Sequence, residues 1–232
     1  MSHTAQLIRI EQHKNHAVIS LARPSKAHAY TQDMLEELKA IIQSLPSSTK
    51  SAVIQSEGHR AFCAGADLNE LNNAHPTKAL FLLSQQVFNL LAKASFVSIA
   101  AIHGPAVAGG FELAMACDLR VAGPLATFSL PEVSLGLIPS AGGCSRLPKL
   151  VGPTRAKAVI LGHQKVSAEE ALAWGLVNRL VDDPHQNAHA WAEQIAMQDS
   201  DALRMAKQVI DHPSFHQERV NEALLYAKKQ GQ

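Results

Sequence analysis

Two short, almost wholly apolar segments constrain the fold of this chain most, SAVIQS (51–56) and FVSIAAIHG (96–104). Apolar runs of this length are typical of strands that are buried on both faces. Between them, TKALFLLSQQVFNLLAKA (77–94) has the pattern of a long amphipathic helix. Because buried strands that alternate with helices indicate parallel pairing through βα crossovers, we predict an α/β core.

The remaining segments extend this pattern. LIRI (7–10) and HAVISL (16–21) are expected to form a hairpin of strands, and TQDMLEELKAIIQSL (31–45) has helical spacing. LRVAG (119–123) and ATFSL (126–130) supply two more short strands. After residue 150 the pattern becomes mostly helical, in five segments: 154–162, 167–175, 189–197, 201–210 and 219–229. We therefore divide the chain into a core, residues 1–150, and a helical C-terminal region, residues 151–232.

Two end signals support one of these C-terminal helices. Ser167 followed by Glu170 forms a capping box, and Gly175 is a C-terminal stop signal.

Charge and composition exclude several classes of function. The 232 residues include 21 Lys and Arg against 20 Asp and Glu, without a basic run, so nucleic acid is not an expected partner. The most apolar stretch, 96–116, is interrupted by His103, Pro105 and glycines, which argues against a membrane span. The N-terminus lacks the pattern of a secretory signal. Three widely spaced cysteines indicate reduced thiols, and we expect a cytoplasmic protein.

Two glycine turns precede predicted helices, and each carries an acid. Gly109 and Gly110 lie between a strand and a helix that contains Glu112, and Ala64-Gly65-Ala66 precedes Asp67. Unpaired N–H groups at a helix start attract negative charge, and glycine allows a ligand oxygen to approach closely. The N–H groups of Gly109 and Ala66 could thus clamp one carbonyl oxygen from two sides. For each turn read alone, tight strand–helix packing is the favoured alternative.

A third acid follows a proline in FSLPEVSLGLIPSAGG (128–143). Apolar residues at 133, 135, 137 and 138 are expected to surround Glu132, and such surroundings raise the pKa of a carboxyl group. An exposed loop glutamate is an equally probable reading of this segment. The following SAGGCSRL lacks the lysine of a Walker loop, so it does not predict nucleotide binding.

Other residues of reactive type are weaker candidates. The pairs His185/His189 and His212/His216 have helical spacing without a third ligand, and we expect no metal site. Cys63 has small apolar neighbours, which favours a buried thiol over a nucleophile, and His103 is expected to be a packed or surface residue.

Taken in order, RAFCAGADL (60–68), IAAIHGPAVAGGFELAMACDLRVA (99–122) and FSLPEVSLGLIPSAGGCSRLPKLVG (128–152) closely resemble the crotonase, or enoyl-CoA hydratase/isomerase, family. RPSKAHAYTQDMLEEL (23–38) and VSAEEALAWGLVNRLV (166–181) extend the resemblance to roughly residues 7–210. It implies an α/β spiral of repeated ββα units, trimers or pairs of trimers, and acyl-coenzyme A substrates. The C-terminal helical region would then serve oligomerisation and cover the acyl pocket.

The resemblance also assigns roles to particular positions. The two oxyanion-hole N–H groups fall on Ala66 and Gly109, and the two catalytic glutamates on Glu112 and Glu132. The coenzyme A site is implied at the following residues: Lys26, Ala27, Ala64, Gly65, Ala66, Asp67, Leu68, Asn69 and Gly109.

These assignments predict an enoyl-CoA hydratase. Glu112 would activate water, Glu132 would protonate the α-carbon, and the two N–H groups would stabilise the enolate. Neither a metal nor a redox cofactor is required, since coenzyme A is part of the substrate. Two alternatives stay open: a double-bond isomerase or another acyl-CoA lyase or hydrolase on the same scaffold, and a non-catalytic acyl-CoA-binding protein.

The sequence departs from the family pattern at four points. His28 replaces an asparagine of the family, Val97 replaces a proline, and Asn69 stands where many relatives carry a longer basic side chain. After NEALLYAKKQGQ the family's closing D-x-x-E-G-x-x-A-F helix is not found, so we expect the C-terminal helical region to be shortened.

Overall fold

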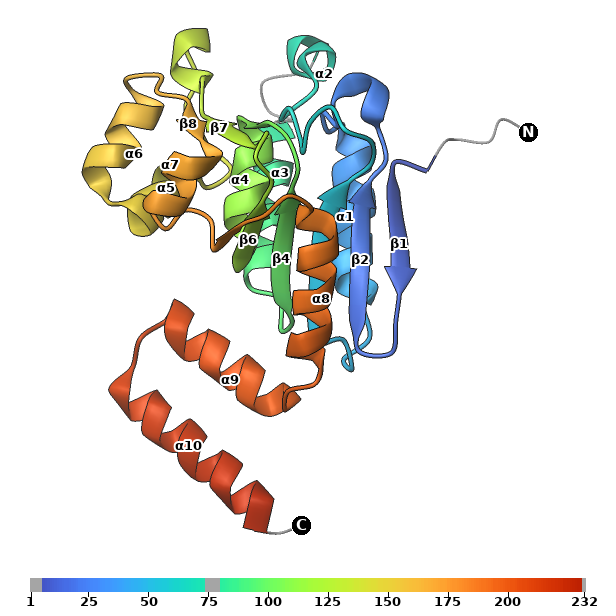
Figure 1. The fold of residues 1–232 in the computed structure, drawn as a ribbon, viewed down its shortest axis with the longest axis vertical. Coiled ribbons are helices and arrows are strands. Elements are labelled where there is room, and N and C mark those ends of the chain that lie inside the picture. The colour runs from blue at the N-terminus through green and yellow to red at the C-terminus, as the bar shows by residue number, and fades with distance from the viewer. Residues whose placement is uncertain (1–5, 74–79, 231–232) are drawn as a thin grey trace.

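A computed structural model describes residues 6–73 and 80–230 of the chain. Its main sheet has six strands in the order β1-β2-β3-β4-β6-β9 (Figure 1). These strands are β1 (Ile8–Gln12), β2 (His16–Leu21), β3 (Ser51–Ser56), β4 (Val97–Ile102), β6 (Leu119–Ala122) and β9 (Arg179–Leu180). A second sheet has the order β5-β7-β8, formed by β5 (Ala106–Val107), β7 (Thr127–Ser129) and β8 (Val166–Ser167).

The predicted buried strands lie at the centre of the main sheet. β3 and β4 pair in parallel, with Ser51 opposite Val97, and both are almost wholly buried. β1 and β2 form the expected antiparallel hairpin, and the other neighbours in this sheet are parallel. The α/β prediction is therefore confirmed, together with the parallel pairing of its central strands.

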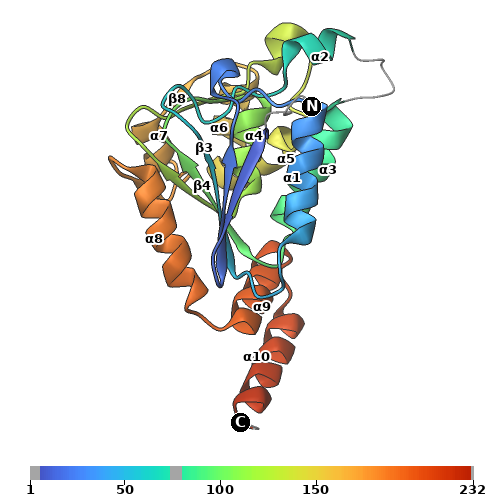
Figure 2. The same cartoon turned by 90° about the vertical axis from the view of Figure 1, so that its right-hand side faces the viewer.

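The described residues form ten α-helices, most of which connect or cover these strands. They are α1 (Gln32–Ser44), α2 (Leu68–Asn73), α3 (Leu80–Ala92), α4 (Gly109–Ala116), α5 (Gly143–Val151), α6 (Pro153–Ile160), α7 (Ala168–Ala173), α8 (Pro184–Ala196), α9 (Ser200–Asp211) and α10 (Phe215–Gln230), counted over the described residues. The helix expected over 77–94 corresponds to α3, although 77–79 lie outside the described residues. Figure 2 shows α1 and α3 on one side of the strands and α8 on the other.

Local signals in the sequence explain where several helices begin and end. The Thr31 side chain accepts a hydrogen bond from the Met34 N–H at the start of α1. The predicted capping box of α7 is present, because Ser167 and Glu170 each accept a hydrogen bond from the other's backbone N–H. Gly175 follows this helix with φ +73°, the left-handed conformation of a helix stop.

Residues beyond 150 contribute to the core as well. β9 pairs with β6, and α8 packs on β3 and β4 through Ala188 and Ala192. The last two helices, α9 and α10, extend away from this body (Figures 1 and 2). The division of the chain at residue 150 stays a prediction.

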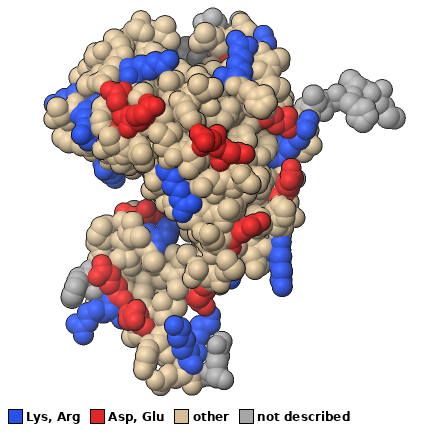
Figure 3. Space-filling model, in the orientation of Figure 1, with Lys and Arg blue, Asp and Glu red and all other residues tan. Residues whose placement is uncertain are grey.

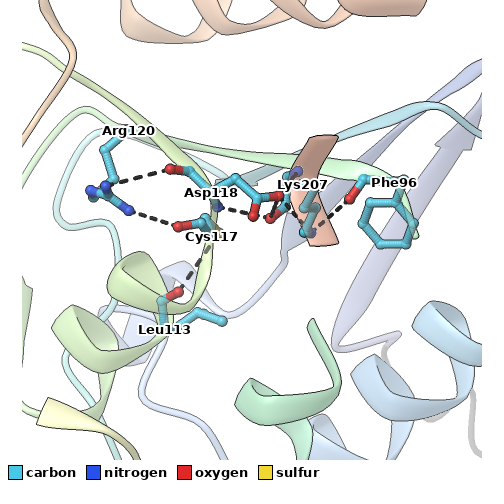
Figure 4. A network of polar contacts seen from close by, with 7 residues as sticks. Phe96, Leu113, Cys117, Asp118, Arg120 and Lys207 are labelled. Atoms are coloured by element: carbon cyan, nitrogen blue, oxygen red, sulfur yellow. Dashed lines mark hydrogen bonds and ion pairs between the residues drawn. The ribbon is translucent and has the colours of Figure 1, made fainter. Parts of the chain in front are cut away.

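A polar network joins α9 to the main sheet (Figure 4). Lys207 Nζ on α9 donates to Asp118 Oδ2 at 2.8 Å and to the Phe96 carbonyl at 3.0 Å. The same Asp118 oxygen accepts hydrogen bonds from the backbone N–H and hydroxyl of Ser98 on β4. Asp118 and Lys207 therefore fix α9 against the beginnings of β4 and β6, and α9 and α10 together form the C-terminal hairpin.

The surface agrees with the balanced charge of the sequence. On the face shown in Figure 3, basic and acidic residues are interspersed along the whole length of the molecule. Within residues 6–73 and 80–230, no helix is long and apolar enough to cross a membrane.

Candidate active site

Tyr30, in the loop before α1, pairs with the segment that contains Ala66. The Tyr30 N–H donates to the Gly65 carbonyl at 2.8 Å, and the Asp67 N–H donates to the Tyr30 carbonyl at 2.9 Å. In such a parallel bridge the residue between the two bonds directs its own N–H to the opposite side. The Ala66 N–H therefore points away from Tyr30.

The second predicted donor begins helix α4. Ala108, the residue before it, has φ +52° and ψ −128°, a conformation that a residue with a Cβ adopts only under strain. The angle ψ of Ala108 sets the orientation of the peptide that carries the Gly109 N–H. An N–H in the first turn of a helix has no partner within that helix, so the Gly109 N–H can donate to an acceptor outside it.

Close packing around glycine brings the two segments together. A Cβ on Gly65 would lie 3.1 Å from the Gly109 nitrogen and 3.0 Å from the Ala108 Cβ. A Cβ on Gly109 would lie 2.0 Å from Tyr30 Oη, and one on Gly110 would lie 2.0 Å from the Cys63 carbonyl oxygen. The glycine pair is thus required for packing, and the same packing places Gly109 beside the Gly65-Ala66 segment. Tight packing accounts for the glycine pair, and the oxyanion-hole role of the Ala66 and Gly109 N–H groups stays a prediction.

Glu112 lies on α4 and is 3% exposed. Its Oε1 accepts a hydrogen bond from the Gly143 N–H at 2.8 Å. Burial raises the pKa of Glu112, and the backbone N–H of Gly143 together with the charge of Arg146 opposes that rise. This carboxyl group is therefore oriented by a donor that favours its ionised form.

Glu132 begins a short 3-10 helix, Glu132–Leu135, and is 7% exposed. Burial and the negative charge of Glu112 raise its pKa to about 7. Its Oε2 is buried and has no hydrogen-bond partner among the residues that the structure describes. The expected burial and raised pKa of Glu132 are thus present.

The apolar neighbours predicted to enclose Glu132 do not do so. Val133, Leu135, Leu137 and Ile138 are themselves 36–66% exposed. This expectation was wrong because the 3-10 helix and the residues that follow it expose these side chains while Glu132 is buried.

The segments assigned to coenzyme A lie side by side. The Ala64 N–H donates to the Ala27 carbonyl at 3.0 Å, which joins the loop of Lys26 to the turn that ends at Ala66. Lys26, Leu68 and Asn69 are exposed, so they are accessible to a large ligand.

Asp67 has a different environment from the other residues of this set. It is buried, and its Oδ2 accepts a hydrogen bond from Arg23 at 2.6 Å, which lowers the pKa of Asp67. Its other oxygen accepts from the Asn69 N–H at the start of α2. The carboxylate of Asp67 therefore stabilises the turn rather than extending toward solvent.

His28, the departure from the family asparagine, has a structural explanation. It lies in the left-handed region, with φ +55°, where asparagine is favoured and other side chains are uncommon. Its buried ring accepts from the Arg23 N–H through Nδ1 and contacts the Glu57 carbonyl through Nε2 at 2.8 Å. These two contacts hold the loop of Lys26 in place without an asparagine.

The other reactive residues lie in the scaffold. Cys63 is fully buried, its thiol lies 3.1 Å from the His28 carbonyl, and burial raises its pKa to about 12, which does not suit a nucleophile. His185 pairs with His103, and His189 contacts Gln55. In the described part of the chain, no three His, Cys, Asp or Glu residues form a possible metal site.

Two residues of this site were not predicted from the sequence. Tyr30 supports both donor segments, and Arg146 lies close enough to Glu112 to affect its pKa. Arg146 follows the glycine pair 142–143, which was the one local signal for it.

The chain is similar in sequence and in fold to known proteins. Residues 11–230 match the family model described as Enoyl-CoA hydratase/isomerase. A relative from Arabidopsis thaliana named "Probable enoyl-CoA hydratase 2, mitochondrial" is 38% identical over 199 residues, which cover 83% of this chain and 66% of that protein.

Two solved structures share the fold. The enoyl-CoA hydratase from Thermoplasma volcanium GSS1 has a TM-score of 0.91 at 31% identity, covering 98% of this chain and 95% of that one. An enoyl-CoA hydratase homologue from Thermobifida fusca YX in complex with CoA has a TM-score of 0.89 at 29% identity, with 97% and 95% covered.

Proposed function

This chain belongs to the enoyl-CoA hydratase/isomerase family, and we propose that it is an enoyl-CoA hydratase that converts a 2-enoyl-CoA thioester to a 3-hydroxyacyl-CoA. The observation that carries this proposal is a pair of buried, electrostatically interacting acids with unlike surroundings. Glu112 accepts a hydrogen bond from a backbone N–H, whereas Glu132 has a pKa near 7 and an unpaired oxygen. A hydratase needs one carboxylate and one carboxylic acid at the same time.

The two backbone donors account for the electrophilic part of the reaction. When water adds to C3, the electrons of the double bond move toward the thioester carbonyl and form an enolate. The N–H groups of Ala66 and Gly109 would donate to that oxygen, in a packed site where such bonds are stronger than in water. Their orientation is fixed before substrate binds, by the Tyr30 bridge and by the strained Ala108.

The two glutamates account for the proton transfers. The Glu112 carboxylate takes a proton from water while the water oxygen bonds to C3. The Glu132 carboxylic acid gives its proton to C2 as the enolate collapses. Glu112 ends protonated and Glu132 ionised, and exchange of one proton between them restores the starting state. No metal or redox cofactor enters this scheme.

The coenzyme A part of the substrate would bind at the joined segments of Lys26-Ala27 and 64–69, with Gly109 at their inner end. Their contact and the exposure of Lys26 and Asn69 support this placement, as does the CoA complex of the Thermobifida homologue.

We also propose a homotrimer or a dimer of trimers. Ile210 on α9 and Leu224 and Tyr226 on α10 are 55–77% exposed on the hairpin that extends from the body, and a neighbouring subunit would cover them. Light scattering on the purified protein measures the mass of the assembly directly.

We also propose a cytoplasmic location, because the three cysteines are unpaired, which suits a reducing compartment.

A spectroscopic assay tests the function. Purified protein mixed with 2-enoyl-CoAs of increasing chain length and branching should remove the absorbance of the conjugated thioester. Conversion of a 3-enoyl-CoA without dependence on Glu112 would favour an isomerase instead. Tight binding of every thioester without turnover would favour a non-catalytic acyl-CoA-binding protein and would overturn the hydratase proposal.

A further inference from the structure

The turn before α5, residues 139–143, carries the donor to Glu112, and its two glycines face opposite partners. Gly142 has φ +122°, and a Cβ there would lie 1.8 Å from Nη1 of Arg146. A Cβ on Gly143 would lie 2.5 Å from the Pro139 Cβ and 3.1 Å from Glu112 Oε1. The glycine pair therefore leaves room for a guanidinium on one side and for a carboxylate on the other.

Side chains from α5 and α3 hold this turn. Arg146 Nη1 donates to the Ala141 carbonyl at 2.9 Å, and Nη2 donates to Asn89 Oδ1 on α3 at 2.6 Å. Gln85, one turn earlier on α3, donates to the Ser140 carbonyl at 2.9 Å. The two forked donors of Arg146 thus connect the turn to a second helix, a geometry that a lysine ammonium does not reproduce.

We propose that Arg146 is a positioning residue of this site, which fixes the Gly143 N–H on Glu112 and keeps Glu112 as the carboxylate that activates water. This inference rests on the proposed hydratase function. The surroundings of the two glutamates then give them distinct roles, because the guanidinium of Arg146 is hydrogen-bonded to the turn that contacts Glu112.

The electrostatics agree with this assignment. The charge of Arg146 lowers the pKa of Glu112 against the effect of burial, whereas burial and the charge of Glu112 together raise that of Glu132. Four described side chains interact electrostatically with Glu112: Arg146, Glu132, Tyr30 and Cys144. Burial raises the pKa of both the Tyr30 phenol and the Cys144 thiol, so these two are neutral near pH 7. Arg146 is then the cation of the set.

Three variants separate charge from geometry. Arg146→Met removes both, Arg146→Lys keeps the charge without the fork, and Lys149→Met, exposed on the same helix, is the control. For Arg146→Met we expect kcat to fall by up to about 10²-fold with KM changed much less, because the misplacement affects the reacting groups. The acid limb of its pH–kcat profile should move to higher pH, since Glu112 loses the cation that favours its ionised form. Arg146→Lys should lower kcat while its acid limb stays near that of the wild type.

A carboxyl titration provides a readout that does not need turnover. In protein labelled with ¹³C at glutamate carboxyl groups, with Glu112→Gln to assign the signal, Glu112 should titrate at higher pH in Arg146→Met than in the wild type. An unmoved Glu112 titration and acid limb would overturn the inference, as would a rise in KM alone. If Arg146→Met does not fold, a wild-type kcat in Arg146→Lys would also overturn it. Wild-type protein that hydrates no enoyl-CoA would instead refute the proposed function, because the titration is independent of activity.

Discussion

The Gly143 N–H donates a 2.8 Å hydrogen bond to Oε1 of Glu112, although 31 residues separate the two in the sequence. The bond joins the start of α5 to the first turn of α4. It therefore connects the acid on the glycine turn at 109–110 to a second glycine turn at 142–143. The site depends on such contacts between turns, and the following predictions test them.

The pH dependence of hydration should reflect Glu132. Its pKa is raised to about 7, and hydration uses its protonated form, so kcat should fall as the pH rises through about 7. Dehydration of the 3-hydroxyacyl-CoA starts with Glu132 ionised and Glu112 protonated, so the pair again carries one proton, and its kcat should fall over the same interval. Both rates can be measured between about pH 5 and 9. A hydration rate that increases through neutral pH would contradict the assigned role.

Gly109→Ala should damage both stability and activity. The added Cβ would lie 2.0 Å from Tyr30 Oη, so the helix start or the ring must move, at a cost of about 1–3 kcal/mol in the free energy of unfolding. The same movement displaces a donor and should lower kcat. Urea unfolding and the hydration assay measure the two effects.

A second substitution and a control identify the cause. Adding Tyr30→Phe to Gly109→Ala removes the nearest atom and should restore part of the stability. Gly175→Ala tests a glycine after α7, with φ +73°, whose Cβ would have no neighbour within 4 Å, and it should leave kcat unchanged. Equal loss of kcat in both glycine variants would argue against a specific role for Gly109.

Arg120 should contribute strongly to stability. It is 4% exposed, and it donates to the Leu176 carbonyl at 2.6 Å. It also donates to the Cys117 carbonyl at 2.7 Å, just after α4 (Figure 4). Arg120→Met leaves these buried carbonyls unpaired and should cost roughly 1–3 kcal/mol in the free energy of unfolding. Arg204→Met removes only an exposed ion pair with Asp201 and should cost less than about 1 kcal/mol. Similar urea midpoints for the two variants would contradict this account.

The sequence was sufficient for the parts of the fold that local patterns determine. The apolar runs of β3 and β4 and the capping box of α7 follow from residues close in sequence. Glu112 and Glu132 were recognisable as candidate acids, because each lies beside a glycine or proline turn, and their catalytic roles stay predictions.

The rest depends on contacts between distant segments. The Tyr30 backbone pairs with residues 65–67, and its ring lies beside Gly109. No local sequence pattern predicts either contact. Arg146 donates a hydrogen bond to Asn89, 57 residues earlier. The burial of the apolar residues after Glu132 was predicted wrongly, because composition does not determine which side chains of a short 3-10 helix and the following turn face the interior.

The central claim is that Glu132 supplies the proton that completes hydration, and one variant tests it most directly. Glu132→Gln keeps the size of the side chain and removes its proton. We predict that the loss of conjugated-thioester absorbance from a 2-enoyl-CoA slows by roughly 10²–10⁴-fold, while Glu36→Gln, exposed on α1, retains the wild-type rate. A Glu132→Gln protein that hydrates the thioester as fast as the wild type would contradict the account.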